Sequence, residues 1–106
     1  MSITTHVLDA TTGRPAAGLE VALSQQDGGG WRELTRRRTD ADGRVPDLAG
    51  KTTAGVYRIV FQTEAYLQVE TFYPEIVVIF RITGPAGHHH VPLLLSPYAY
   101  STYRGS

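Results

Sequence analysis

The chain has no cysteine among its 106 residues. This absence excludes a disulfide framework, a thiolate zinc site and a cysteine nucleophile, and it permits a reducing compartment. The formal net charge is zero, because ten Lys and Arg side chains balance ten Asp and Glu side chains. No overall field favours a nucleic acid or an anionic membrane as partner, so we expect a small-molecule ligand or a local contact.

Apolar runs long enough to span a membrane are also missing. Residues 1–6 lack the basic and then apolar pattern of a signal peptide. We therefore expect a cytoplasmic protein with no membrane partner. The length fits one domain over residues 1–106 with a single core.

Several catalytic motifs are lacking too. The sequence has neither a Gly-rich phosphate loop with a lysine nor a Gly-x-Ser-x-Gly elbow. Because a cysteine nucleophile is also excluded, we do not expect covalent catalysis. A water molecule activated by histidine is the simpler chemistry.

Apolar residues recur mostly with a period of two. Leu19, Val21 and Leu23 alternate with more polar neighbours, and residues 57–61 repeat the pattern. Such alternation is typical of half-buried strands. Turn signals separate these segments, at residues 12–15, 27–30, 42–43, 84–85 and 96–97. Short strands at this spacing predict an all-β chain folded as a two-sheet antiparallel sandwich or a barrel.

Two segments depart from this pattern. Residues 63–70 carry no helix breaker, and Thr63 can cap a helix whose first turn contains Glu64, so we predict one short helix there. Residues 76–80 are apolar on both faces of a strand. Left bare, such a strand is an aggregation hazard, and a second subunit is its natural cover.

Histidines are the first candidates for chemistry. His6 lies in the first predicted strand, where a lone histidine is more often structural than catalytic. In an extended chain His88 and His90 share a face and His89 does not. Zinc requires at least three converging ligands, so His6 would have to join this pair, and we do not expect a metal site. Without a metal, two imidazoles can act as base and acid near neutral pH.

Arg44 and the final residues are further candidates. Arg44 follows the turn over residues 40–43, and its guanidinium either is solvated or binds a planar, carbonyl-rich ligand. Residues 36–38 are consecutive arginines that point to alternating faces of a strand, so they make no basic patch. Residues 103–106 follow directly on a predicted strand. We expect this ending to be ordered and to contribute to a site.

Together these segments closely resemble the hydroxyisourate hydrolase branch of the transthyretin-like family. The resemblance covers essentially the whole chain, and its matching segments are residues 4–9 (TTHVLD), 39–44 (TDADGR), 90–97 (HVPLLLSP) and 100–106 (YSTYRGS). The closing Tyr-Arg-Gly-Ser separates the enzymes of the family from its hormone carriers.

The resemblance implies a two-sheet β-sandwich with one short helix, assembled as a homotetramer from two dimers with the sites in the channel between them. It implies hydrolysis of 5-hydroxyisourate to 2-oxo-4-hydroxy-4-carboxy-5-ureidoimidazoline, in urate breakdown and without a cofactor. The implied catalytic residues are His6, Arg44 and His90. The implied substrate-binding residues are Tyr103, Arg104, Gly105 and Ser106. His88 and His89 fall where the family pattern is looser and stay outside this set.

Three alternatives remain open. The first is a transthyretin-like carrier that holds an aromatic ligand in the tetramer channel and performs no reaction. Its ligand would gain little from burying the polar groups of His6, Arg44 and His90. The second is a structural sandwich module of the adhesive or carbohydrate-binding kind, and the third is a histidine-based metal enzyme.

Overall fold

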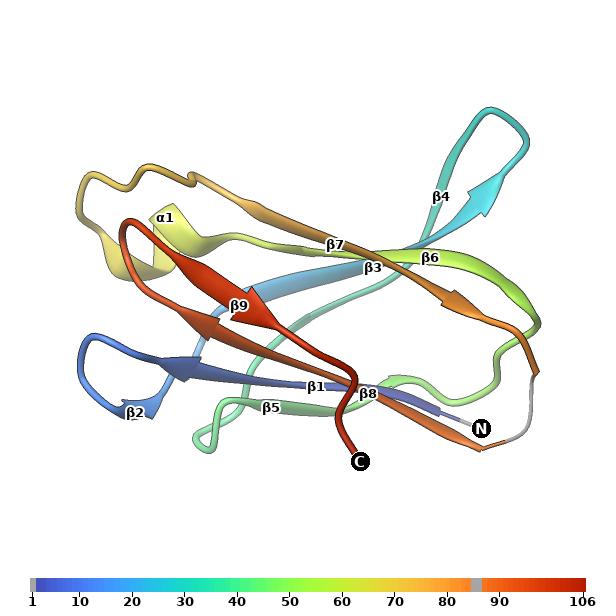
Figure 1. The fold of residues 1–106 in the computed structure, drawn as a ribbon, viewed down its shortest axis with the longest axis horizontal. Helices are drawn as coiled ribbons and strands as arrows, with labels where there is room; N and C mark the ends of the chain where they lie inside the picture. Colours follow the sequence, from blue (N-terminus) through green and yellow to red (C-terminus); the bar gives the residue numbers. More distant parts are fainter. Residues whose placement is uncertain (1, 85–86) are drawn as a thin grey trace.

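Two β-sheets stacked face to face form the molecule (Figure 1). The computed structural model describes residues 2–84 and 87–106. In these residues the strands are β1 (Ser2–Asp9), β2 (Arg14–Pro15), β3 (Glu20–Asp27), β4 (Gly30–Arg38), β5 (Arg44–Ala49), β6 (Gly55–Phe61), β7 (Ile76–Ile82), β8 (His88–Leu95) and β9 (Tyr100–Thr102). One sheet has the order β4-β3-β6-β7, and the other has the order β2-β1-β8-β9 with β5 also paired to β1. The predicted two-sheet sandwich is confirmed.

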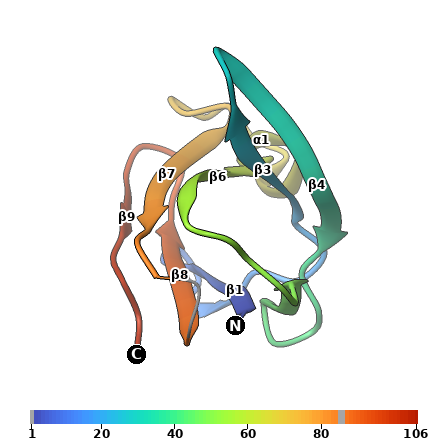
Figure 2. The same cartoon turned by 90° about the vertical axis from the view of Figure 1, so that its right-hand side faces the viewer.

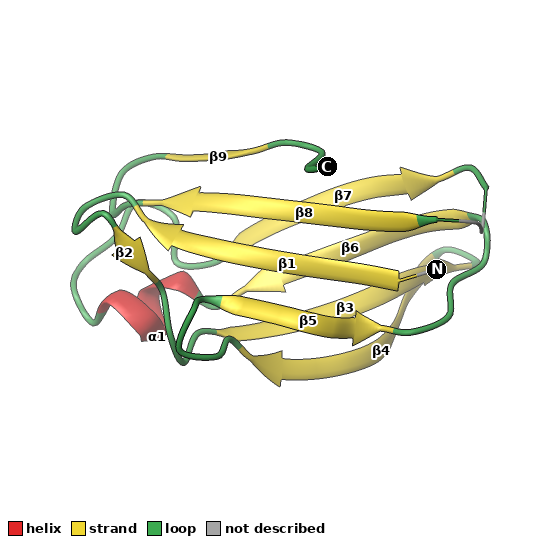
Figure 3. Ribbon diagram, turned by 90° about the horizontal axis from the view of Figure 1, so that it is seen from below, coloured by secondary structure: helices red, strands yellow, loops and turns green. Residues whose placement is uncertain are grey.

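The pairing of β1 with β8 departs from the antiparallel expectation. These two strands run parallel from Ser2↔His88 to Asp9↔Leu95, whereas the other strand pairs of the described residues are antiparallel. Sequence neighbours joined by short turns must pair antiparallel. Strands β1 and β8 are not sequence neighbours, because all four strands of the other sheet lie between them along the chain. Seen from below, β9, β8, β1 and β5 follow one another across this sheet (Figure 3).

The core lies between the sheets, as the period of two predicts. Leu19, Val21 and Leu23 are fully buried, and so are Ile59 and Phe61 on the neighbouring β6. Across the sandwich, the inward residues of β1 and β8 complete the same cluster. Because alternate residues of a strand face opposite sides, the residues between them on β1 and β8 are left on the outer face.

The helix is shorter than predicted, and its cap was predicted wrongly. Helix α1 spans Thr63–Leu67 and follows Gln62 without a side-chain cap. The hydroxyl of Thr63 is buried and donates to the carbonyl of Tyr73 at 2.8 Å. This hydroxyl therefore makes a tertiary hydrogen bond and does not cap the helix. The helix ends at Leu67, and the next residue, Gln68, has a left-handed φ of +57°. No helix in residues 2–84 or 87–106 has the length and apolar character to cross a membrane.

The edge strands β7 and β9 lie next to each other on one side of the sandwich (Figure 2). On β7 the inward Ile76 and Val78 are buried, but Val77 is 39% exposed and Ile79 is 59% exposed. The strand is therefore apolar on both faces, as the sequence indicates, and the outer face is bare in the single chain.

Candidate active site

Three strands bring His6, Arg44 and His90 to one face of the five-stranded sheet. In the β1–β5 ladder His6 pairs with Arg44, and in the β1–β8 ladder Thr4 pairs with His90. Direct partners and residues two apart share a face, so all three predicted catalytic side chains project outward from the same area. The sheet places them together although they are far apart in sequence.

Arg44 is held by the turn that precedes it. The Asp40 carboxylate accepts hydrogen bonds from the amides of Asp42 and Arg44, at 2.9 and 3.0 Å. Gly43 has a φ of +74°, and a Cβ there would overlap the carbonyl oxygen of Val7. The close approach of the two backbones allows a hydrogen bond from the Val7 amide to the Gly43 carbonyl, at 2.7 Å. The turn thus fixes the start of β5, with an exposed Arg44, against β1.

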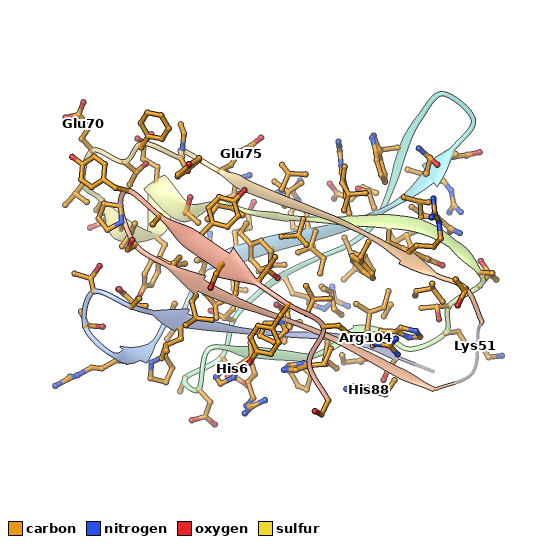
Figure 4. The ribbon with its side chains drawn as sticks, in the orientation of Figure 1. His6, Lys51, Glu70, Glu75, His88 and Arg104 are labelled. Atoms are coloured by element: carbon orange, nitrogen blue, oxygen red, sulfur yellow. The ribbon has the colours of Figure 1, made fainter. Side chains whose placement is uncertain are left out.

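The final residues fold back onto His90. The amide of Gly105 donates to the carbonyl of His90 at 2.8 Å, forming an isolated bridge beyond β9. A Cβ on Gly105 would lie 2.5 Å from Cδ2 of the His90 ring. The end of the chain therefore lies against the sheet, and only glycine leaves room for this imidazole. Figure 4 labels His6, His88 and Arg104 in the region where the end of the chain crosses the sheet.

A cleft of about 210 Å³ opens on this face. Among the predicted site residues it brings together Arg44, His90 and Ser106. His6 is the strand partner of Arg44 but is not part of the cleft lining. The remaining lining residues are Thr4, Thr5, Pro46 and His88.

Tyr103 and Arg104 line a separate cleft. It measures about 330 Å³ and lies where β7 faces β8 and the end of the chain, with His89 and His90 also in its wall. The single chain therefore divides the predicted substrate-binding residues between two clefts that share His90. Nδ1 of His89 is buried there and has no hydrogen-bond partner within the described part of the chain.

Two residues at the cleft were not selected from the sequence, Thr4 and His88. The Thr4 hydroxyl lies 2.7 Å from Nδ1 of His90 and 3.1 Å from Nε2 of His88. The alternation that puts His88 and His90 on one face was visible in the sequence. Their common partner Thr4 was not, because it depends on the parallel register of β1 and β8.

The surroundings of His90 favour its neutral form. Burial lowers the pKa of His90 below its usual value, and the nearby Arg44, His88 and His6 lower it further, whereas a hydrogen bond with the backbone of Thr4 acts in the opposite direction. The pKa of His89 is also lowered, first by burial and then by Arg104. A neutral imidazole beside a guanidinium can take a proton from water while the guanidinium stabilises a developing oxyanion.

The hypothesis of a histidine-based metal site requires a cluster of metal-ligating side chains. Among residues 2–84 and 87–106, no three His, Cys, Asp or Glu side chains stand close enough together to hold a metal ion. His88 and His90 do stack, with ring centroids 6.2 Å apart and planes at 14°.

Comparison with known proteins gives a consistent family match. A family model described as "HIUase/Transthyretin family" matches residues 3–105. The chain is 48% identical over 109 residues to the 5-hydroxyisourate hydrolase of Salmonella dublin, covering 98% of this chain and 80% of that protein.

Among solved structures the fold is similar both to a carrier and to an enzyme. Sea bream transthyretin in complex with thyroxine superposes with a TM-score of 0.92 at 34% identity, covering 99% of this chain and 95% of that one. The 5-hydroxyisourate hydrolase of Klebsiella pneumoniae superposes with a TM-score of 0.88, also at 34% identity, and covers 100% of both chains. Fold similarity therefore does not separate binding from catalysis, and the side chains of the site must do so.

Proposed function

This chain belongs to the HIUase/transthyretin family, and we propose that it is a hydrolase that opens the ring of 5-hydroxyisourate with water. The observation that carries the proposal is the grouping of His6, Arg44 and His90 on one outer face of the sheet. A binding channel for an apolar aromatic ligand gains nothing from two imidazoles and a guanidinium, because unpaired polar groups cost free energy when a ligand buries them.

In the proposed reaction, His6 and His90 orient a water molecule and one of them takes its proton. The water oxygen bonds to a ring carbonyl carbon, and the carbonyl oxygen gains negative charge that Arg44 stabilises. The carbon–nitrogen bond of the ring amide then breaks, and the protonated histidine returns a proton to the leaving nitrogen. The product is a ureidoimidazoline carboxylate, and the scheme uses no cofactor.

The end of the chain completes the proposed pocket. Ser106 lines the same cleft as Arg44 and His90, and Gly105 packs against the His90 ring. We assign Tyr103 and Arg104 to substrate binding from the adjoining cleft, where they share a wall with His90.

Product analysis tests this function directly. Freshly made 5-hydroxyisourate, labelled with ¹³C and mixed with the protein, should show the carbon signals of the ring-opened carboxylate well before they arise spontaneously. If the substrate decays at its spontaneous rate while thyroxine or another aromatic ligand binds, the protein is a carrier.

Arg44 should affect both the rate and its pH dependence. We expect Arg44→Met to lower kcat/KM by about 10²- to 10³-fold, because an oxyanion donor is lost. The same change removes a cation that lowers the pKa of His90, so that pKa rises. A base works only when neutral, and the loss of activity on acidification should therefore begin at higher pH than in the wild type. Rate–pH profiles measure both effects.

Arg38→Met, an exposed arginine of β4, is the control and should leave the profile unchanged. An Arg44→Met variant with a wild-type profile would remove Arg44 from the site.

We further propose that the protein is a homotetramer built as a dimer of dimers. Support comes from the two neighbouring edge strands, which belong to different sheets: Ile79 of β7 is 59% exposed, and Tyr100 and Tyr103, in and just after β9, are 41% and 60% exposed. An open apolar edge of this kind pairs with a second copy or aggregates. Cytoplasmic location stays a prediction of the sequence.

Ile79→Lys should weaken this assembly, because the lysine would be buried without a partner charge in the interface. Light scattering on a sizing column should show a smaller mass for this variant than for the wild type. Val69→Lys, at a site that is 53% exposed and outside the edge strands, is the matched control. A wild-type protein that runs as a monomer would contradict the tetramer.

A further inference from the structure

Ser2, Thr4, His88 and His90 form a continuous chain of hydrogen bonds along the outer face of β1 and β8. The Ser2 hydroxyl lies 2.6 Å from Nδ1 of His88, whose Nε2 lies 3.1 Å from the Thr4 hydroxyl. That hydroxyl lies 2.7 Å from Nδ1 of His90. The parallel register pairs Ser2 with His88 and Thr4 with His90, so hydroxyl and imidazole groups alternate.

The Thr4 hydroxyl couples the two histidines, because it carries one proton. It can donate that proton to one ring nitrogen while accepting a hydrogen bond from the other. When both imidazoles are neutral, the buried hydroxyl is therefore fully paired only if one of the two nitrogens, Nδ1 of His90 or Nε2 of His88, carries a proton and the other does not. Thr4 is 8% exposed, so little water is available to replace a lost partner.

We propose that His88, acting through Thr4, is a positioning residue that sets the tautomer of His90 and relays a proton between His90 and the surface. The proposal rests on the assignment of His90 to the hydrolase site. Its two states follow from the hydrogen-bond chain. In the first, His90 donates from Nδ1 to Thr4, Thr4 donates to Nε2 of His88, and Nε2 of His90 is free to act as base toward the cleft. In the second state, Nε2 of His90 carries a proton, Thr4 donates to Nδ1 of His90, and Nε2 of His88 donates to Thr4.

The relay balances its protons in each half of the reaction. When Nε2 of His90 takes a proton from water, its Nδ1 proton passes to Thr4, the Thr4 proton passes to His88, and the Nδ1 proton of His88 leaves to Ser2 or to solvent. When Nε2 later protonates the leaving nitrogen, each of these protons moves back by one position. His90 therefore stays close to neutral throughout.

A physical reason for such a relay lies in the charges around His90. Burial disfavours a positive charge on this ring most, and Arg44 from β5, His88 on β8 and His6 from β1 add to this effect, while Arg104 near the end of the chain acts on His89. An imidazolium at His90 is thus costly in this setting. Passing the Nδ1 proton toward the exposed His88 moves the charge away from Arg44.

Thr4→Val and His88→Phe test the relay. Valine keeps the shape of threonine without its hydroxyl, and phenylalanine keeps a flat ring without its nitrogens. We expect each variant to lower kcat by about 10- to 100-fold, the loss found where the partner that orients a metal-bound histidine is removed, with little change in KM. In His88→Phe the pKa of His90 should also rise, because a neighbouring group that lowers it is gone, and the acidic loss of activity should begin at higher pH.

Two further readouts separate a relay from a structural role. Thr4→Ser restores a hydroxyl and should restore the kcat and the solvent deuterium isotope effect that Thr4→Val loses. Thr35→Val, a half-buried threonine on the opposite sheet, should change neither. Nitrogen-15 NMR of labelled histidine should show a changed tautomer balance at His90 in Thr4→Val and in His88→Phe.

The NMR result does not depend on turnover, so it tests the relay apart from the hydrolase assignment. Unchanged His90 nitrogen shifts in both variants would overturn the proposal. If the wild type hydrolyses the substrate, a wild-type kcat and pH profile in both variants would also overturn the proposal. A wild type that leaves 5-hydroxyisourate untouched would instead overturn the proposed function.

Discussion

Replacing His90 with alanine is expected to lower kcat by about 10²- to 10⁴-fold, the usual contribution of a general base. The reason lies in its position. Burial, and then Arg44, His88 and His6 nearby, lower the pKa of His90 and favour its neutral form, and His90 lines both clefts of the site. His6→Ala should cause a loss of the same order, since His6 pairs with Arg44 on the same face. Steady-state kinetics on 5-hydroxyisourate measure both losses.

Thr35→Val, on the opposite sheet and outside both clefts, is the control for this pair and should cost less than tenfold. Losses below tenfold in both His6→Ala and His90→Ala, from folded proteins, would sink the assignment of the two histidines to catalysis.

Gly105→Ala is expected to lower kcat by about 10²-fold, the effect of displacing a reacting group by roughly 1 Å. One added methyl group would lie 2.5 Å from Cδ2 of His90 and 3.2 Å from Cγ of Pro92. The ring or the end of the chain must move to relieve this overlap, and the 2.8 Å bond between Gly105 and the His90 carbonyl resists the movement. Because Gly105 acts through His90, the double variant with His90→Ala should be no slower than His90→Ala alone.

Gly29→Ala is the control, since a Cβ at Gly29 meets nothing within 4 Å. Circular dichroism and thermal unfolding should show that both glycine variants keep the fold. Full activity of Gly105→Ala would mean that the end of the chain does not restrain the His90 ring.

Local patterns in the sequence predict the strands and the core well. Leu19, Val21 and Leu23 alternate with a period of two and are fully buried, because one face of each strand meets the opposite sheet. The apolar β7 is likewise bare on its outer face, where Val77 and Ile79 lie. The family resemblance then places His6, Arg44 and His90, and the ladders bring all three to one face.

Features that depend on distant contacts could not be predicted in this way. The parallel pairing of β1 with β8 has no local signal, and without it nothing links Thr4 to His88 and His90. Thr63 illustrates the same limit, since its hydroxyl bonds to Tyr73 instead of capping its own helix. Sequence spacing also could not show that Tyr103 and Ser106 line different clefts.

The most direct measurement is the decay of ultraviolet absorbance of freshly generated 5-hydroxyisourate, with the full chain and with a variant that ends at Tyr103. The variant lacks Arg104, Gly105 and Ser106, which contact His90 or line the clefts around it. We predict rapid decay with the full chain and decay close to the spontaneous rate with the shortened, folded variant. Spontaneous decay in the presence of the folded full chain would contradict the hydrolase assignment and favour a protein that binds its ligand without reaction.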